Sequence, residues 1–238
     1  MWRQLIKSAF NRVGIKLSRY SAIRDPAAVR MRFLERFNIN VILDVGANTG
    51  QYAGALRRDG YQGRIISFEP LSSAFGLLEK RSREDHQWTA VHTGLGDTVE
   101  EREINISKNS YSSSLLGMLP NLAATAPEAQ YIDKERIRID LLDNYYSQHC
   151  NAHDNVFLKI DTQGFTNHVL RGAKESLEHI AGLQIELSLV SLYDGEPLIG
   201  EVISGLERLG FRLILLCPEF TDSVTGQQLQ VDGIFFRL

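Results

Sequence analysis

Short apolar runs alternate along this chain with segments in which apolar residues recur every three or four positions. The runs predict strands at residues 41–45, 64–69, 88–93, 103–107, 136–141, 155–161, 183–189, 211–216 and 233–237. The helical spacing predicts helices at residues 51–58, 71–83, 166–177 and 199–209, the second of them capped by Ser72. This alternation, ending in two close strands, predicts an α/β fold: a mainly parallel sheet with one antiparallel strand and helices on both faces.

A separate helical segment precedes this pattern. Its apolar residues recur at helical spacing: Trp2, Leu5, Ile6, Ala9, Phe10, Val13 and Leu17. Basic residues lie between them, at Arg3, Lys7, Arg12, Lys16 and Arg19, and no acid occurs before Asp25. We therefore expect a basic amphipathic helical segment at residues 1–37 and a single domain at residues 38–238.

Two roles stay open for the basic segment. We favour a helix that packs on the domain or on a partner chain, since this pattern more often serves that role. The alternative is peripheral contact of residues 1–20 with an anionic membrane surface. The segment does not resemble a secretory signal, because charges interrupt its apolar residues.

The turn after the first strand carries the most specific chemistry. A dinucleotide fingerprint aligned on Gly46 would need glycines where the chain has Asn48 and Gln51, and no P-loop run occurs. The turn instead offers the acid Asp44, bare backbone and the amide of Asn48. These groups favour S-adenosylmethionine (SAM), which has an ammonium group and no phosphate, over NAD. An NAD-dependent oxidoreductase remains the disfavoured alternative.

The second strand ends in another acid. Glu69 follows Gly46 by 23 residues, a spacing that suits a carboxylate accepting hydrogen bonds from ribose hydroxyls. Pro70 cannot continue a central strand, so the chain leaves the sheet there. Because strand ends of a parallel sheet meet at one edge, we expect one crevice to hold Asp44, Glu69, Gly96, Asp97 and Asp161.

A further group of polar residues lies around the strand at 155–161. Lys159 and Asp161 share one face of this strand, where they could orient and deprotonate an acceptor hydroxyl. A lysine that reaches into solvent is the favoured alternative for Lys159. Glu186 stands among apolar residues, so it needs a hydrogen-bonding role, either in the site or in a structural pair.

Composition narrows the class of protein. The chain has 238 residues, 43% of them hydrophobic and 23% charged, which suits one large soluble domain. Its net charge of −3 argues against nucleic acid as a partner. Two distant cysteines suggest a reducing, cytoplasmic compartment, and no histidines or cysteines stand at metal-ligand spacing. No apolar run is long enough to span a membrane, so membrane contact would be peripheral, at the inner face.

Six ordered motifs resemble the FkbM-type SAM-dependent methyltransferases, over residues 38–238. They are Asp44-Val45-Gly46-Ala47-Asn48-Thr49-Gly50, Phe68-Glu69-Pro70, Leu95-Gly96-Asp97, Leu158-Lys159-Ile160-Asp161-Thr162-Gln163-Gly164, Ile185-Glu186-Leu187-Ser188 with Leu192-Tyr193, and Asp232-Gly233-Ile234-Phe235. The resemblance implies a class I methyltransferase (Rossmann-like) fold with a seven-stranded sheet. It also implies SAM as cofactor and methyl transfer to an oxygen, often a sugar or glycan hydroxyl.

The same resemblance assigns roles to residues. It implies that the cofactor is held by Asp44, Gly46, Ala47, Asn48, Gly50, Glu69, Pro70, Gly96 and Asp97, with the last two beside the adenine. It places Asp161 near the methyl group or the acceptor, and we expect Glu186 to support it during direct displacement at the sulfonium methyl.

The chain departs from its relatives after Asp161, where they commonly carry acids. Gln163, Thr166 and His168 occupy those places. His168 is a candidate general base, although a surface histidine is the favoured alternative. These departures leave open a SAM-binding protein with weak or lost catalysis. The polar segment at residues 108–133 is expected to form a loop beside the acceptor, and homo-oligomer formation stays open.

Overall fold

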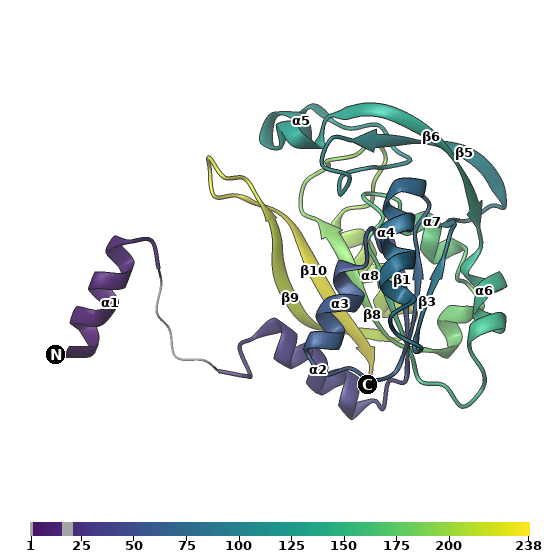
Figure 1. Ribbon diagram of the computed structural model, residues 1–238, viewed down its shortest axis with the longest axis horizontal. Coiled ribbons are helices and arrows are strands. Elements are labelled where there is room, and N and C mark those ends of the chain that lie inside the picture. The colour runs from purple at the N-terminus through teal and green to yellow at the C-terminus, as the bar shows by residue number, and fades with distance from the viewer. Residues whose placement is uncertain (1, 16–20) are drawn as a thin grey trace.

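The computed structural model describes residues 2–15 and 21–238, and its centre is a seven-stranded sheet (Figure 1). The strands are β1 (Val41–Val45), β2 (Arg64–Phe68), β3 (Trp88–Val91), β7 (Val156–Ile160), β8 (Ile180–Ser188), β9 (Phe211–Thr221) and β10 (Gln228–Arg237). Their order is β3-β2-β1-β7-β8-β10-β9, and β10 runs antiparallel to both of its neighbours. This confirms the predicted mainly parallel sheet with one antiparallel strand.

Helices cover both faces of this sheet. On one face α2 (Pro26–Arg36), α3 (Gln51–Arg58) and α4 (Ser72–Ser82) pack over alternate residues of the strands, such as Ile42 and Ile65. On the other face α6 (Leu142–His149), α7 (Thr166–Arg171) and α8 (Ile199–Arg208) pack over the intervening residues, such as Leu43. Since side chains alternate along a strand, each core strand contributes to both layers and reads as a continuous apolar run.

A second sheet lies over the carboxyl edge of the first. It consists of β4 (Gly94–Leu95), β6 (Tyr131–Asp140) and β5 (Glu100–Ser107), in that order (Figure 1, top). The segment expected to be a loop at residues 108–133 instead contains α5 (Pro120–Thr125), a 3₁₀ turn (Pro127–Ala129) and the start of β6. Leu122, Ala126 and Ala129 are buried against Leu192 and Tyr193, and this apolar contact orders the segment.

Other elements differ from the sequence expectation in their ends. Ser72 does not cap α4 by its side chain; its amide and hydroxyl donate to Glu135 instead. The helix expected at residues 166–177 ends at Arg171, and a 3₁₀ turn follows at Ser176–His179. The last two strands are longer than predicted and form one antiparallel hairpin, β9–β10, whose register is interrupted by bulges.

The N-terminal segment contains two helices with different surroundings. Helix α2 starts at the capping carboxylate of Asp25, which accepts from the Ala27 amide at 3.0 Å, and it packs on the sheet through Phe33 and Phe37. Helix α1 (Trp2–Arg12) stands apart from the domain in Figure 1. Three residues of the expected amphipathic pattern, Lys16, Leu17 and Arg19, lie outside the described residues. No helix in the described parts of the chain is long and apolar enough to cross a membrane.

Gly172 provides a test of the contact between α7 and the second sheet. A Cβ there would lie 1.8 Å from the carbonyl oxygen of Gly96. We predict that Gly172→Ala lowers the free energy of unfolding by at least about 2 kcal/mol, because backbone must move to admit the methyl group. The measurement is urea denaturation.

Gly76 serves as the matched control, since a Cβ at this position inside α4 meets nothing within 4 Å. Gly76→Ala should leave stability unchanged or raise it by up to about 1 kcal/mol. Equal stability of the two variants would contradict the close packing at Gly172.

Candidate functional site

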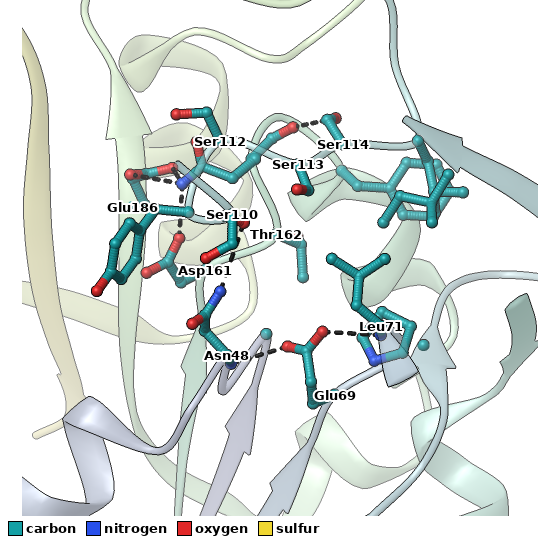
Figure 2. Close-up of a pocket in the computed structure, with 18 of the residues that line it drawn as sticks. Asn48, Glu69, Leu71, Ser110, Ser112, Ser113, Ser114, Asp161, Thr162 and Glu186 are labelled. Atoms are coloured by element: carbon teal, nitrogen blue, oxygen red, sulfur yellow. Dashed lines mark hydrogen bonds between the residues drawn. The ribbon is translucent and has the colours of Figure 1, made fainter. Parts of the chain in front are cut away.

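A cavity of about 380 Å³ opens at the carboxyl edge of the central sheet (Figure 2). It lies between the ends of β1, β2 and β7, the second sheet, the segment at residues 109–115 and the β9–β10 hairpin. This is the edge at which open α/β sheets bind ligands, and the volume suits a small organic molecule.

Glu69 lies at one side of this cavity, directly after β2. Its carboxylate accepts hydrogen bonds from the amide of Asn48 at 2.8 Å and from the amide of Leu71 at 2.9 Å (Figure 2). The residue is only 4% exposed, and this burial raises the pKa of Glu69 to about 7, although the two amide bonds lower it. Each carboxylate oxygen keeps a further lone pair for a ligand hydroxyl.

The turn after β1 brings this carboxylate close to β7. Gly46 has a φ of +78°, and a Cβ there would lie 1.8 Å from the carbonyl oxygen of Asp161. Only glycine allows the two strand ends to approach so closely. Asn48, also left-handed at +48°, donates its side-chain amide to the carbonyl of Ser110 at 3.4 Å.

Left-handed backbone at residues other than glycine is concentrated at the cavity. Asn48, Ser110 and Gln163 all have positive φ angles and all line it, whereas Asn38 lies elsewhere. Such conformations cost free energy and are typical of binding sites that surrounding contacts hold in place.

Asp161 and Glu186 lie at another side of the cavity and are joined by one amide group. The side-chain nitrogen of Gln163 donates to Asp161 at 2.9 Å and to both carboxylate oxygens of Glu186 at 3.1 and 3.2 Å (Figure 2). The side-chain carbonyl oxygen of Gln163 accepts a hydrogen bond from the hydroxyl of Tyr193 at 2.7 Å. Gln163 therefore fixes the two carboxylates relative to each other.

The two carboxylates differ in their electrostatic surroundings. Lys159 donates to Asp161 at 2.9 Å and compensates its charge. Glu186 has no cation at hydrogen-bond distance among the described residues, and burial together with the charges of Asp161 and Asp232 raises its pKa well above the usual range. Glu186 therefore holds a proton to higher pH than an ordinary glutamate and, once ionised, is a stronger base than one.

Lys159 does not reach into solvent, contrary to the favoured sequence interpretation. It is 6% exposed and lies between Asp161 and Asp44, the latter at 3.9 Å. Although burial lowers the pKa of Lys159, these carboxylates raise it above its usual range, so the ammonium stays charged. Glu186, in turn, has both of the roles considered for it, since it faces the cavity and pairs with Gln163.

The cavity gathers part of the residue set expected from the sequence. The expected residues that line it are Gly46, Asn48, Glu69, Pro70, Asp161 and Glu186. Those that lie behind or beside the lining are Asp44, Ala47, Gly50, Gly96, Asp97 and His168. Asp44 is a fully buried residue of β1, where it accepts a hydrogen bond from the Ser67 hydroxyl at 3.0 Å, and burial raises its pKa.

His168 and Asp97 bond to each other instead of facing the cavity. The Nδ1 of His168 lies 2.9 Å from Asp97, Arg171 donates to the same carboxylate at 2.8 Å, and the histidine ring stacks on Phe165. Partial burial raises the pKa of Asp97, but the bonds from His168 and Arg171 lower it below its usual value. The structure thus gives His168 a structural place, because its ring lies outside the lining where a general base would act.

Sequence analysis does not predict that three parts of the site lie together. They are Gln163, Tyr193 and the serine-rich segment at residues 110–114. The Ser114 hydroxyl donates to the backbone carbonyl of Gln163 at 2.6 Å. The Tyr193 hydroxyl also lies 3.4 Å from the backbone carbonyl of Ser112. In the sequence Gln163 stands out only as a departure from an acidic pattern. Its position between two carboxylates depends on the fold of distant segments, for which the sequence carries no local signal.

The charged groups of the lining are all carboxylates. They belong to Glu69, Glu128, Asp161, Glu186 and Glu219, and the described lining contains no lysine or arginine. The lining also contains apolar side chains, among them Leu71, Leu95 and Phe165, which suit contact with a flat ring. Such a lining favours a nucleoside with a positive charge over one with a pyrophosphate, which would lack a cationic partner.

Comparison with known proteins identifies the family. A model of the methyltransferase FkbM domain matches residues 44–213. The chain belongs to the FkbM methyltransferase family. No match was found among curated protein sequences. The matched residues include Glu69, Asp161 and Glu186 of the cavity lining, whereas Glu219, Phe220 and Gln230 of the β9–β10 hairpin lie beyond the match.

A solved FkbM structure supports the class I methyltransferase fold. The methyltransferase FkbM from Methylobacillus flagellatus KT is 14% identical with a TM-score of 0.51, over 84% of this chain and 44% of that one. This FkbM protein is thus a longer chain, of which the present one spans less than half. Magnesium protoporphyrin IX methyltransferase from Synechocystis PCC 6803, solved with bound SAM, is 9% identical with a TM-score of 0.47, over 99% and 96% of the two chains.

The protonation of Glu69 can be observed directly. With a pKa raised to about 7 by burial, this carboxyl should be protonated at pH 5 to 6 and lose its proton around pH 7. We predict a protonated-carboxyl infrared band that titrates near neutrality and is missing from Glu69→Gln. A spectrum in which Glu69→Gln removes no band between about pH 5 and pH 8 would contradict the assignment.

Proposed function

We propose that this protein binds SAM in the cavity and transfers its methyl group to a hydroxyl of a sugar, glycan or related polyol. One observation carries the proposal: the cavity connects a buried carboxylate suited to a ribose, Glu69, with a carboxylate pair suited to an acceptor, Asp161 and Glu186. SAM supplies an electrophilic methyl group on sulfur, so the protein needs to orient the acceptor and take up one proton.

The residues near Glu69 fit the nucleoside part of SAM. Glu69 already accepts one backbone amide on each oxygen, which holds its carboxylate rigidly for the two hydroxyls of a ribose. Leu71, Leu95 and Phe165 offer apolar surface for the adenine. The bare backbone of Gly46 and the buried, unpartnered hydroxyl of Thr162 leave room and a hydrogen-bonding group for the methionine part.

The opposite residues fit a hydroxyl acceptor. Asp161 is held in place by Lys159 and Gln163, so it can accept a hydrogen bond from the acceptor and orient its oxygen. Glu186, with its raised pKa, takes up the proton as the oxygen attacks the methyl carbon in line and the carbon–sulfur bond breaks. S-adenosylhomocysteine and the methyl ether are then the products.

The segment at residues 109–115 supports a polyol acceptor. Ser110, Tyr111, Ser112 and Ser113 line the cavity with hydroxyl and carbonyl groups. Part of this hydrogen-bonding capacity is already used within the segment, as between Asn109 and Ser112 at 3.1 Å. The remaining groups can bind several hydroxyls of one molecule, as polyol recognition requires.

The contribution of Glu69 can be measured by calorimetry with SAM. We predict that Glu69→Ala weakens SAM binding at least about tenfold, because the ribose loses a charge-assisted acceptor. Wild-type affinity should also fall as pH drops below about 7, since protonation removes an acceptor, and this pH dependence should be missing from Glu69→Ala.

The exposed Glu84 provides a matched control, and Glu84→Ala should bind SAM like the wild type. If Glu69→Ala and Glu84→Ala bind SAM equally well, the proposed ribose contact is wrong.

The role of Glu186 can be tested by turnover. The assay supplies labelled SAM with a panel of glycan and lipid-linked sugar acceptors and follows the release of S-adenosylhomocysteine. We predict that Glu186→Gln lowers kcat by about 10²–10⁴-fold and removes the acid limb of the pH–rate profile, with SAM affinity unchanged within a few fold.

The conservative change Asp161→Glu should retain more activity than Asp161→Asn, because it keeps the charge paired with Lys159. Full turnover by Glu186→Gln would refute its role as base. Tight SAM binding without turnover on any acceptor would instead indicate a SAM-binding protein that has lost catalysis.

A further inference from the structure

Helix α1 exposes an apolar stripe that the domain does not cover. Trp2, Ile6 and Phe10 on the helix and Val13 directly after it recur at intervals of three or four residues, and they are 67%, 40%, 40% and 70% exposed. Figure 1 shows the helix standing apart from the sheet and its covering helices. Of the two placements in the favoured expectation, packing on the domain is not seen in the structure, and packing on a partner chain stays a prediction.

The other residues of this segment carry one sign of charge. Residues 1–24 contain Arg3, Lys7, Arg12, Lys16, Arg19 and Arg24 and no acid. The whole chain nevertheless has a net charge of −3, so the domain that follows is acidic. The basic charge is therefore concentrated on and directly after the helix with the exposed apolar stripe.

We propose that α1 docks this protein on an anionic lipid surface. A bilayer surface satisfies both features of the helix, because its acyl region accepts an apolar stripe while its anionic headgroups attract lysine and arginine. Tryptophan is among the residues that favour this interface. With 11 residues the helix is far too short to span the hydrocarbon core, so it lies in the plane of the surface.

A second copy of the chain is a poorer occupant for the stripe. Pairing two α1 helices would bring two identical clusters of cations together, and like charges repel without an acid between them. Docking on a membrane also leaves the candidate active site free, since α1 contributes no residue to the cavity lining. The proposal therefore does not depend on the proposed methyl transfer.

The test is flotation of the full chain with lipid vesicles. We expect binding to vesicles that contain phosphatidylglycerol in phosphatidylcholine, and little binding to phosphatidylcholine alone. Raising the salt from about 0.1 M to about 1 M should weaken the binding, because screening shortens the reach of the cations. Trp88 is buried in the domain, so a vesicle-dependent blue shift of fluorescence that Trp2→Phe removes would report insertion of α1.

Paired variants separate the two faces of the helix. Lys7→Glu with Arg12→Glu should lower the partition coefficient at least about tenfold on anionic vesicles. Ile6→Asp with Phe10→Asp should do the same by removing the apolar stripe. The matched controls are Lys174→Glu with Arg208→Glu for charge and Val99→Asp with Val224→Asp for polarity, all at exposed positions of the domain.

Either of two results would overturn the proposal. One is that vesicle binding does not depend on α1: either the chain does not bind anionic vesicles at low salt, or the α1 variants and the control variants lose binding equally. The other is a concentration-dependent dimer in sedimentation that Ile6→Asp with Phe10→Asp abolishes, which would assign the stripe to a second copy. Because SAM binding by calorimetry should be unchanged in all α1 variants, a failure here is distinguishable from a failure of the proposed function.

Discussion

The close approach of β1 and β7 at Gly46 is the constraint on which the site depends. Asp161 donates its amide to the carbonyl of Val45 at 3.0 Å, and its own carbonyl occupies the space where a side chain at position 46 would stand. This contact brings the turn that binds Glu69 against the loop that carries Asp161 and Gln163. A larger residue would separate the two sides of the cavity.

A second constraint is the polar layer buried beneath this contact. Trp88 donates to Ser67, which donates to Asp44, and Lys159 lies between Asp44 and Asp161. Buried charges are tolerated when they are paired, and here one ammonium serves two carboxylates. The layer also bears on the cavity: Lys159 pairs with Asp161, and burial together with the nearby charge of Asp161 raises the pKa of Glu186.

Sequence reasoning succeeded where one local pattern decided the outcome. The apolar runs at β1 and β7 and the acid at the end of β2 follow from strand periodicity and from the edge at which parallel strands end. It failed for residues that act through partners distant in sequence. Sequence alone favours a solvent-exposed position for Lys159, and only the structure places Asp44 beside it. The pairing of His168 with Asp97 likewise has no signal in the sequence, which favours a surface histidine and leaves a general base as the alternative. The segment at 108–133 is expected to be a loop because no local pattern indicates its structure. Its apolar residues are ordered by packing on Leu192 and Tyr193, which lie far along the chain.

The sequence by itself determined the strands of the central sheet, four of the helices that cover it (α3, α4, α7 and α8), the family motifs, the glycine turn at residue 46 and the basic, amphipathic character of α1. These properties depend on side-chain periodicity and local backbone preference, which neighbouring residues fix. Only the tertiary structure decided which carboxylates share a cavity, which of them Lys159 neutralises, how Gln163 joins Asp161 to Glu186, and that α1 leaves its apolar stripe uncovered. Those outcomes depend on distances between segments far apart in the chain, and electrostatic and packing energies are set by such distances.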